Sequence, residues 1–394
     1  MPARALRVII AGAGVGGLCL AQGLRRAGVD VTVYERDPAA LARGQGYRLR
    51  IDRHGTAALR DCLPPDLFAL YEQTANPPYE SVGAVYDHRL ELLYQHAQRS
   101  GRWDPAAAAR GVNRLTLREV LLCGLADVVR FGVTVTGFDL AAGTVRVHRA
   151  DGQSDPADLL VAADGLGSVI RGGVAPEAEV LDTGLRAIYG MTPLDDALLD
   201  ALPAALFGGS CPVQGPDRRT LALGSYQPVR SPAEFGLTPV PDYMKWTLVA
   251  PVSTYSMSER ELWSAKPAAL LAEALRCVTG WHPVLVDLVR RCDPGVTFPL
   301  AIRAAAHVPE FPVRPVTLVG DAIHATTPVG GTGANTALRD AALLCARLRE
   351  VAGGRDLPEA VAAYQAEMRG YGSAAARNSL RGAEAIFRCD PVPI

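Results

Sequence analysis

Residues 6–17 read LRVIIAGAGVGG, and this stretch decides the fold of the chain. Its first half is short, rich in β-branched residues and bounded by glycine, which is typical of a buried parallel strand. Gly12, Gly14 and Gly17 follow in the spacing G-x-G-x-x-G, and a helix is predicted from there to about Ala27. The first glycine permits a tight turn, the second lets a pyrophosphate approach the backbone, and the third lets helix and strand pack closely. The stretch therefore predicts a dinucleotide-binding βαβ unit.

An acidic residue stands where such a unit needs one. A second strand is predicted over residues 29–34, and it ends at Glu35 and Arg36. Glu35 follows Gly17 by 18 residues, and a carboxylate at this point can accept hydrogen bonds from the adenosine ribose. NAD and FAD share the fingerprint, so it does not choose between them. A glycine-rich turn without a ligand is the alternative interpretation.

The far end of the chain carries a second strand–loop–helix pattern. A strand over residues 316–319 runs into Gly320 and Asp321, and a loop rich in proline and glycine leads to a helix that opens near residues 333–335. A carboxylate in that place can bind a ribityl or ribose hydroxyl. The helix start offers unpaired N–H groups and a positive dipole end, which would stabilise the negative edge of a reduced flavin. A plain connector is the alternative.

The middle of the chain adds further polar residues. A buried strand over residues 159–163 ends at Asp164 and Gly165, and Ser168 and Arg171 follow shortly after. Doubly wound proteins bind their ligands at the carboxyl ends of such strands.

Several arginines stand in places that suit an anion. A helix predicted over residues 112–122 has Arg114 in its first turn and Arg118 one turn later. The positive end of the helix dipole disfavours an arginine in the first turn, so this position indicates an anionic partner. A solvated side chain is the alternative interpretation. Arg48 and Arg50 alternate with apolar residues, which an edge strand explains equally well.

Composition excludes several classes of function. The 394 residues are 49% hydrophobic and 21% charged, and the net charge of −1 with no basic block argues against nucleic-acid binding. Eight scattered cysteines without a C-x-x-C pair argue against a zinc site and a disulfide framework. We expect reduced thiols, a cytoplasmic location, no metal and no membrane span.

Together the three motifs resemble those of the class A flavoprotein monooxygenases, the para-hydroxybenzoate hydroxylase-like group. The resemblance implies an FAD site in which Arg114 contacts the cofactor, Asp321 binds its ribityl chain and the loop from Pro328 onward lies beside the flavin ring. Asp164 and Gly165 match a family motif associated with both FAD and NAD(P)H. The implied cofactor-binding residues are Gly12, Gly14, Gly17, Glu35, Arg36, Arg114, Asp164, Gly165, Asp321, Pro328, Gly331, Gly333, Ala334 and Asn335.

The expected fold class is α/β: a Rossmann-like FAD-binding domain built from separated segments, an inserted substrate domain with a mixed or antiparallel sheet, and C-terminal helices. The inserted domain is indicated by short alternating runs, which proline and glycine separate. The predicted boundaries are 1–75, 106–178 and 301–345 for the FAD-binding domain, 76–105 and 179–300 for the substrate domain, and 346–394 for the C-terminal helices.

The resemblance also implies a reaction. NAD(P)H, as NADPH or NADH, reduces the flavin, O₂ adds at C4a, and the hydroperoxide delivers one oxygen atom to a small aromatic or polyketide-like molecule, as in specialised metabolism. Because the cofactor carries this chemistry, no protein acid or base is needed, and the catalytic candidates are only Arg48 and Pro328. Candidates for the substrate pocket are the aromatic side chains Tyr189, Phe207, Tyr226 and Trp246, for which plain core is the alternative.

Other partners and activities stay open at this point. The expected partners are the small-molecule substrate and O₂, in a monomer or homodimer. A related flavin-dependent oxidoreductase (an epoxidase, prenyl-chain reductase or halogenase) or a non-catalytic flavin-binding module are the alternatives. The four tryptophans do not form the W-x-W-x-I-P element of flavin halogenases, which disfavours that option.

Overall fold

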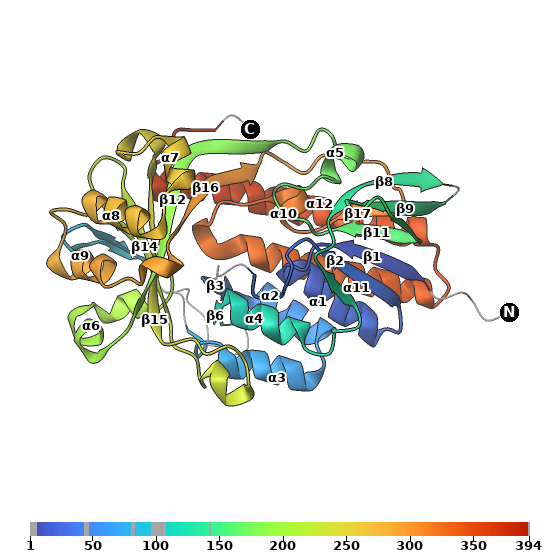
Figure 1. The fold of residues 1–394 in the computed structure, drawn as a ribbon, viewed down its shortest axis with the longest axis horizontal. Coiled ribbons are helices and arrows are strands. Elements are labelled where there is room, and N and C mark those ends of the chain that lie inside the picture. Colours follow the sequence, from blue (N-terminus) through green and yellow to red (C-terminus); the bar gives the residue numbers. More distant parts are fainter. Residues whose placement is uncertain are drawn as a thin grey trace.

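The computed structural model describes residues 6–42, 47–79, 83–95, 104, 108–141 and 143–392. Figure 1 shows two bodies side by side: a parallel sheet covered by helices, and a larger sheet with short helices on its outer side. This is the α/β architecture with C-terminal helices that the sequence predicts.

The parallel sheet has the strand order β17-β11-β1-β2-β7, and every neighbouring pair is parallel. The edge strand β17 and its neighbours β11 and β1 are almost wholly buried, which explains their continuous apolar sequences. The strands come from widely separated parts of the chain, so their carboxyl ends bring distant segments to one edge. The bounds are β17 Val316–Leu318, β11 Leu159–Ala162, β1 Arg7–Ala11, β2 Asp30–Glu35 and β7 Val129–Phe131.

Helices pack around this sheet, and α1 and α11 lie in close contact. A Cβ atom added to Gly16 would lie 3.1 Å from the Cβ of Ala337, and one added to Gly23 would lie 2.6 Å from the Sγ of Cys345. The glycines therefore flatten one side of α1 so that α11 can lie directly on it. The helices are α1 Val15–Arg26, α2 Arg53–Cys62, α3 Pro65–Thr74, α4 Arg114–Leu122, α5 Arg171–Val174, α10 Asp321–His324, α11 Thr332–Ala352 and α12 Leu357–Gly382.

The larger sheet has the order β16-β12-β15-β14-β13-β4-β5 and is antiparallel except between β13 and β4. Its strands are β16 Phe298–Ala305, β12 Val180–Pro193, β15 Tyr243–Pro251, β14 Thr220–Tyr226, β13 Cys211–Gln214, β4 Ala84–Asp87 and β5 Leu92–Gln95. Its outer helices are α6 Asp196–Ala201, α7 Glu259–Ser264, α8 Pro267–Cys277 and α9 Pro283–Arg290.

Alternation along β15 decides which side chains meet those helices. Met244, Trp246 and Leu248 belong to the apolar core between the sheet and its outer helices. Lys245 and Thr247 therefore point the other way, toward the parallel-sheet body.

Smaller elements complete the fold. β3 Arg48–Ile51 pairs with β6 Arg110–Asn113, and β8 Val135–Ala141, β9 Thr144–Arg149 and β10 Ser154–Ala157 form a three-stranded sheet. Within residues 76–105, β4 and β5 pair as an antiparallel hairpin, and residues 80–82, 96–103 and 105 of that segment lie outside the described residues.

One element boundary differs from the prediction. Helix α4 begins at Arg114 rather than at 112, because the Asn113 side chain caps it by accepting from the N–H groups of Leu115 and Thr116. Strands β7 and β8 are separate, because Gly132 turns the chain between them with a φ of +73°.

The domain boundaries remain a prediction, and β16 runs across the one expected at residue 300. All eight cysteines are free thiols, and seven of them are buried. Within the described ranges, no helix combines the length and apolar character that a membrane crossing requires.

We predict that Gly190→Ala destabilises the protein. Gly190 in β12 lies opposite Trp246, and an added Cβ would lie 2.1 Å from the indole ring, which is fully buried. Such overpacking costs about 1–3 kcal/mol of unfolding free energy, to be measured by urea denaturation. Gly370→Ala in α12 is the control, because its added Cβ meets nothing within 4 Å, and equal stability of the two variants would contradict the prediction.

Candidate active site

The turn after β1 leaves open space in front of α1. A Cβ on Gly12 would lie 2.3 Å from the carbonyl oxygen of Ala163, and one on Gly17 would lie 2.2 Å from that of Gly12. A Cβ on Gly14, by contrast, would meet no atom of the described residues within 4 Å. Gly14 is also the N-cap of α1 and brings no side-chain cap, so the first N–H groups of the helix face this space. The turn can therefore receive an anion such as a pyrophosphate.

Glu35 holds this turn in shape from the end of β2. Its Oε2 accepts a 2.9 Å hydrogen bond from the Ala13 N–H, and its Oε1 accepts one of 2.9 Å from the Asp37 N–H. The Arg118 guanidinium lies 3.5 Å from Oε2 and donates through Nε to the Ala13 carbonyl. The sequence indicates for Arg118 only that it lies one helical turn after Arg114. No local sequence pattern predicts that it fixes the turn after β1. Arg36 next to Glu35 is exposed.

The turn after β11 provides a carboxylate with one unsatisfied oxygen. Asp164 Oδ2 accepts from the Val169 N–H at 3.0 Å, but its Oδ1 is buried and has no hydrogen-bond partner within the described residues. Burial raises the pKa of Asp164, and hydrogen bonds from Ser168 and the backbone offset part of this effect. Arg171 ties this turn to α10, because its Nη1 donates to the carbonyl of Ala322 at 3.1 Å.

Asp321 opens α10 and faces the inner cavity of the molecule. Desolvation by the surrounding protein atoms raises the pKa of its carboxyl. The charges of His324 and Arg114 act in the opposite direction. Arg114 also lies over the ring of Tyr47, with 5.6 Å between the guanidinium carbon and the ring centre. Arg114 and Asp321, which lie far apart in the sequence, therefore act on the same space.

A buried carboxylate beneath Asp321 fixes the start of the loop. Asp340 Oδ2 accepts from the Gly320 N–H at 2.6 Å and pairs with His324 Nε2 at 2.6 Å, and Oδ1 accepts from the Tyr371 hydroxyl at 2.6 Å. Burial opposes a charged imidazole, but the Asp340 carboxylate outweighs it and raises the pKa of His324. His324 is thus a packed residue that supports the loop.

The loop from Pro328 to α11 is pinned to β3 by Asn335. The Asn335 amide donates to the carbonyls of Arg50 and Gly331 at 2.7 Å each, and its Oδ1 accepts from the Asp52 N–H at 2.8 Å. The side chain is 3% exposed, so its recorded bonds position the loop. Gly331 takes a φ of +63° as the N-cap of α11.

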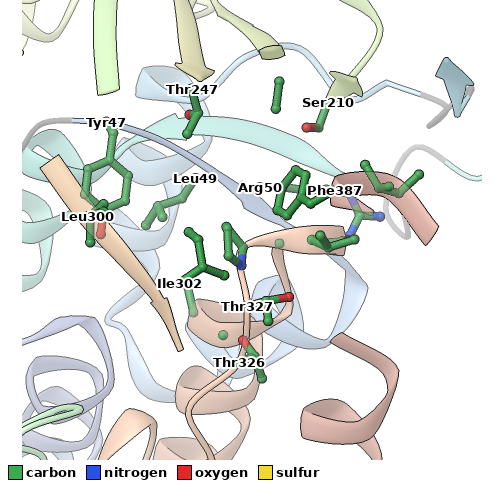
Figure 2. A pocket seen from close by; sticks show the side chains of 18 of the residues that line it. Tyr47, Leu49, Arg50, Ser210, Thr247, Leu300, Ile302, Thr326, Thr327 and Phe387 are labelled. Atoms are coloured by element: carbon green, nitrogen blue, oxygen red, sulfur yellow. Dashed lines mark hydrogen bonds between the residues drawn. The ribbon is translucent and has the colours of Figure 1, made fainter. Parts of the chain in front are cut away.

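A cavity of about 560 Å³ lies between this loop and the larger sheet. Figure 2 shows side chains from β3, β15, β16 and the loop converging on it. One wall is aromatic: Tyr47 and Tyr189 line it, with ring centres 5.3 Å apart. Phe298 supports this wall by stacking on Tyr189, with centres 5.2 Å apart and planes 2° apart. Ile386 and Phe387 from the C-terminal segment close another side, which nothing in the local sequence indicates.

Of the four aromatic pocket candidates, only Tyr189 lines this cavity. Trp246 faces the outer helices, and its Nε1 donates to Thr192 Oγ1 at 3.2 Å. Phe207 packs against the same outer core. Tyr226 is fully buried, with its hydroxyl donating to the Thr74 carbonyl. These three expectations are therefore corrected for this cavity.

The side chains that replace them follow from strand alternation. Lys245 and Thr247 flank Trp246 on β15 and line the cavity. The period-two pattern of this strand is the sequence signal that predicts them, whereas aromatic residue type does not. Arg48 and Pro328 line the cavity as well. Arg48 is held by Nε donating to the Ser225 carbonyl at 2.7 Å and by Nη2 donating to the Tyr79 hydroxyl at 2.7 Å.

Comparisons with known proteins agree with this geometry. Family models match residues 10–72, as an NAD(P)-binding Rossmann-like domain, and residues 297–379, as an FAD binding domain. A solved FAD-containing monooxygenase from Photorhabdus luminescens is 31% identical, with a TM-score of 0.84, and the alignment covers 98% of this chain and 99% of that one.

The chain belongs to the class A FAD-dependent monooxygenases. It is a flavoprotein of the oxidoreductase class, with FAD as its cofactor. The dual O-methyltransferase/FAD-dependent monooxygenase elcB of Phaeosphaeria nodorum is 30% identical over 97% of this chain. The chain spans less than half of that monooxygenase, 46% of its length. The phenazine 1,6-dicarboxylic acid hydroxylase PhzS of Lysobacter antibioticus is 28% identical, covering 92% of this chain and 86% of that protein.

We predict that Gly14→Val weakens FAD binding by roughly tenfold or more while leaving the stability of the FAD-free protein unchanged. The Cβ of the valine would enter the open space in front of α1, where it meets no atom of the described residues within 4 Å. Flavin fluorescence titration measures the affinity, and thermal melting measures the stability. Gly137→Val, whose added Cβ also meets nothing within 4 Å, is the control. Unchanged FAD affinity in Gly14→Val would contradict the assignment of this space.

Glu35→Ala should also raise the FAD dissociation constant, by roughly tenfold, because the Ala13 N–H and Arg118 lose their charged acceptor and the turn loses its shape. Glu91→Ala, at an exposed carboxylate outside the site, should leave the constant unchanged. The same titration compares the two variants, and equal constants would count against the role given to Glu35.

Proposed function

We propose that this chain is a monooxygenase that uses NADPH or NADH and O₂ to place one oxygen atom on a planar, aromatic or polyketide-like small molecule. The observation that carries the proposal is a cavity in which the Pro328 loop and Asp321 meet the aromatic wall of Tyr47 and Tyr189. A flavin held by Asp321 would have its ring in that cavity, in front of the substrate.

The chemistry of the donors supports an extended FAD. The open space at Gly14 suits the pyrophosphate, and the unsatisfied Asp164 Oδ1 suits a hydroxyl donor of the cofactor. Glu35 and Arg36 would lie at the adenosine end, Arg114 and Gly165 along the middle, and Asp321 at the ribityl chain. Pro328, Gly331, Gly333, Ala334 and Asn335 would form or fix the edge of the ring site.

Bound FAD would supply the redox chemistry, by accepting a hydride from NAD(P)H and transferring one oxygen atom of O₂ through its C4a-hydroperoxide. The protein's own residues bind, orient and exclude water. The N-terminal end of α11 presents its first N–H groups toward the loop, which favours negative charge there. The aromatic and aliphatic walls keep the reacting region dry, which protects a reactive intermediate from hydrolysis.

The relatives support a planar substrate. PhzS is named for a phenazine dicarboxylic acid, a flat heteroaromatic molecule. A flat ring would pack on the aromatic wall that Tyr47 and Tyr189 present to the cavity, since aromatic pairs favour offset-stacked and edge-to-face arrangements.

The proposal predicts a yellow protein whose NAD(P)H consumption and O₂ uptake rise when a planar aromatic substrate is added. Reaction under ¹⁸O₂ should place one labelled oxygen atom in the product, as measured by mass spectrometry. Asp321→Ala should lose flavin during gel filtration and lose turnover with it. A yellow protein that neither accepts hydride nor reacts with O₂ after photoreduction would contradict the proposal and favour a non-catalytic flavin module.

A further inference from the structure

The chain contains only two lysines, and one of them is buried inside the cavity. Lys266 is exposed, whereas Lys245 on β15 is 8% exposed. The recorded contact of the Lys245 ammonium is the ring of Tyr189, whose centre lies 5.5 Å away. No hydrogen bond or ion pair to Lys245 Nζ is formed by the residues that the structure describes. A buried amine without such a partner needs an explanation, because burial of an unpaired charge is costly.

A second cation lies beside it. Lys245 pairs across the strands with Gly224, and Arg48 packs over that glycine: a Cβ on Gly224 would lie 3.2 Å from Arg48 Nη1. Directly opposite residues on neighbouring strands have Cβ positions about 5 Å apart, so the Arg48 guanidinium and the Lys245 side chain share one corner of the cavity. Arg48 is fixed there by Ser225 and Tyr79 and cannot swing away without losing both bonds.

The charges around this corner are unbalanced. Among the described residues that line the cavity, the cationic ones are Arg48, Arg50, Lys245 and Arg303, and the one carboxylate is Asp321. Asp321 faces Arg114 and His324, and Arg303 donates to Asp182. The Arg48–Lys245 corner therefore has no anionic partner within the described protein. Burial, together with the nearby Arg48 charge, lowers the pKa of Lys245 to about 7.

We propose that Lys245 accepts the proton of an acidic hydroxyl on the substrate, a phenol or an enol, and that Lys245 and Arg48 then hold the resulting oxyanion. The proposal deepens the monooxygenase function above and rests on it. In the transfer, the Nζ lone pair forms a new N–H bond, the substrate O–H bond breaks, and its electron pair stays on oxygen. The products are an ammonium and an oxyanion. The transfer leaves the net charge of the corner unchanged, and the oxyanion becomes the anionic partner that both Lys245 and Arg48 lack within the described protein.

The same arrangement makes the substrate class more specific. A hydroxyl that ionises in or somewhat above the neutral range can exchange its proton with an amine whose pKa is about 7. The oxyanion would sit beside Tyr189, so the ring that bears it would lie along the aromatic wall. The preferred substrate is therefore a planar ring with an acidic hydroxyl, and its O-methyl ether should be a poor ligand.

The test uses the FAD-loaded protein and 6-fluoro-2-naphthol, whose ¹⁹F NMR shift reports the ionisation of its hydroxyl without interference from flavin colour. The apparent pKa of the bound naphthol should fall by about one unit or more below that of the free compound. Lys245→Met, which keeps the side-chain length and removes the amine, should abolish the fall. Lys245→Arg should keep it through charge alone, and Lys266→Met should leave it unchanged.

Affinity provides the second readout, through perturbation of the flavin spectrum. The wild-type protein should bind the naphthol at least about tenfold more tightly than its methyl ether. Lys245→Met should bind the two compounds with equal affinity. Equal pKa shifts in wild type and Lys245→Met, equal affinity for naphthol and ether in the wild type, or no binding of either compound would overturn the proposal. Neither readout requires NAD(P)H or turnover. A Lys245-dependent shift in a protein without oxygenase activity would therefore count against the monooxygenase function alone.

Discussion

The site depends on the close contact between the start of α11 and the start of α1. Ala337 lies between two glycines: a Cβ on Gly16 would lie 3.1 Å from its Cβ, and one on Gly320 would lie 3.0 Å from it. A larger residue at any of the three positions would push apart the turn after β1 and the turn at Gly320. Because the two glycine-rich turns touch, one elongated cofactor can reach both, although more than 300 residues separate them in the sequence.

Polar anchoring converts this contact into a defined geometry. Asp340 in α11 accepts from Gly320 and His324, at the two ends of α10, and from Tyr371 in α12, and it thereby joins three helices. Asn335 does the same between the loop and β3. Buried polar groups with every partner in place specify one arrangement, whereas removal of one partner leaves the others unsatisfied at a cost of about 1–3 kcal/mol each. Asp340 and Asn335 therefore hold the two ends of the segment from Gly320 to α11 in place.

The sequence predicted the parallel-sheet body well, because its signals are local. A strand, a glycine spacing and an acidic residue at the next strand end are each readable over about 30 residues, and parallel strands then bring their carboxyl ends together. The substrate side was harder to predict. Trp246 was chosen for its residue type, but its neighbour Lys245 lines the cavity, because alternation along a strand and not residue type decides which face is exposed. Arg118 and Phe387 act through contacts far along the chain, for which no local pattern exists. Asn335 is predicted beside the cofactor, which stays a prediction, and the structure adds that its side chain bonds three backbone groups.

The central claim is that distant segments hold one FAD molecule along a continuous path. A crystal structure of the FAD-saturated protein tests it most directly. The account predicts electron density with the pyrophosphate in front of Gly14, the ribityl chain beside Asp321 and the flavin ring in the cavity next to Pro328. Colourless crystals from FAD-saturated solution, or a flavin bound away from these residues, would contradict it.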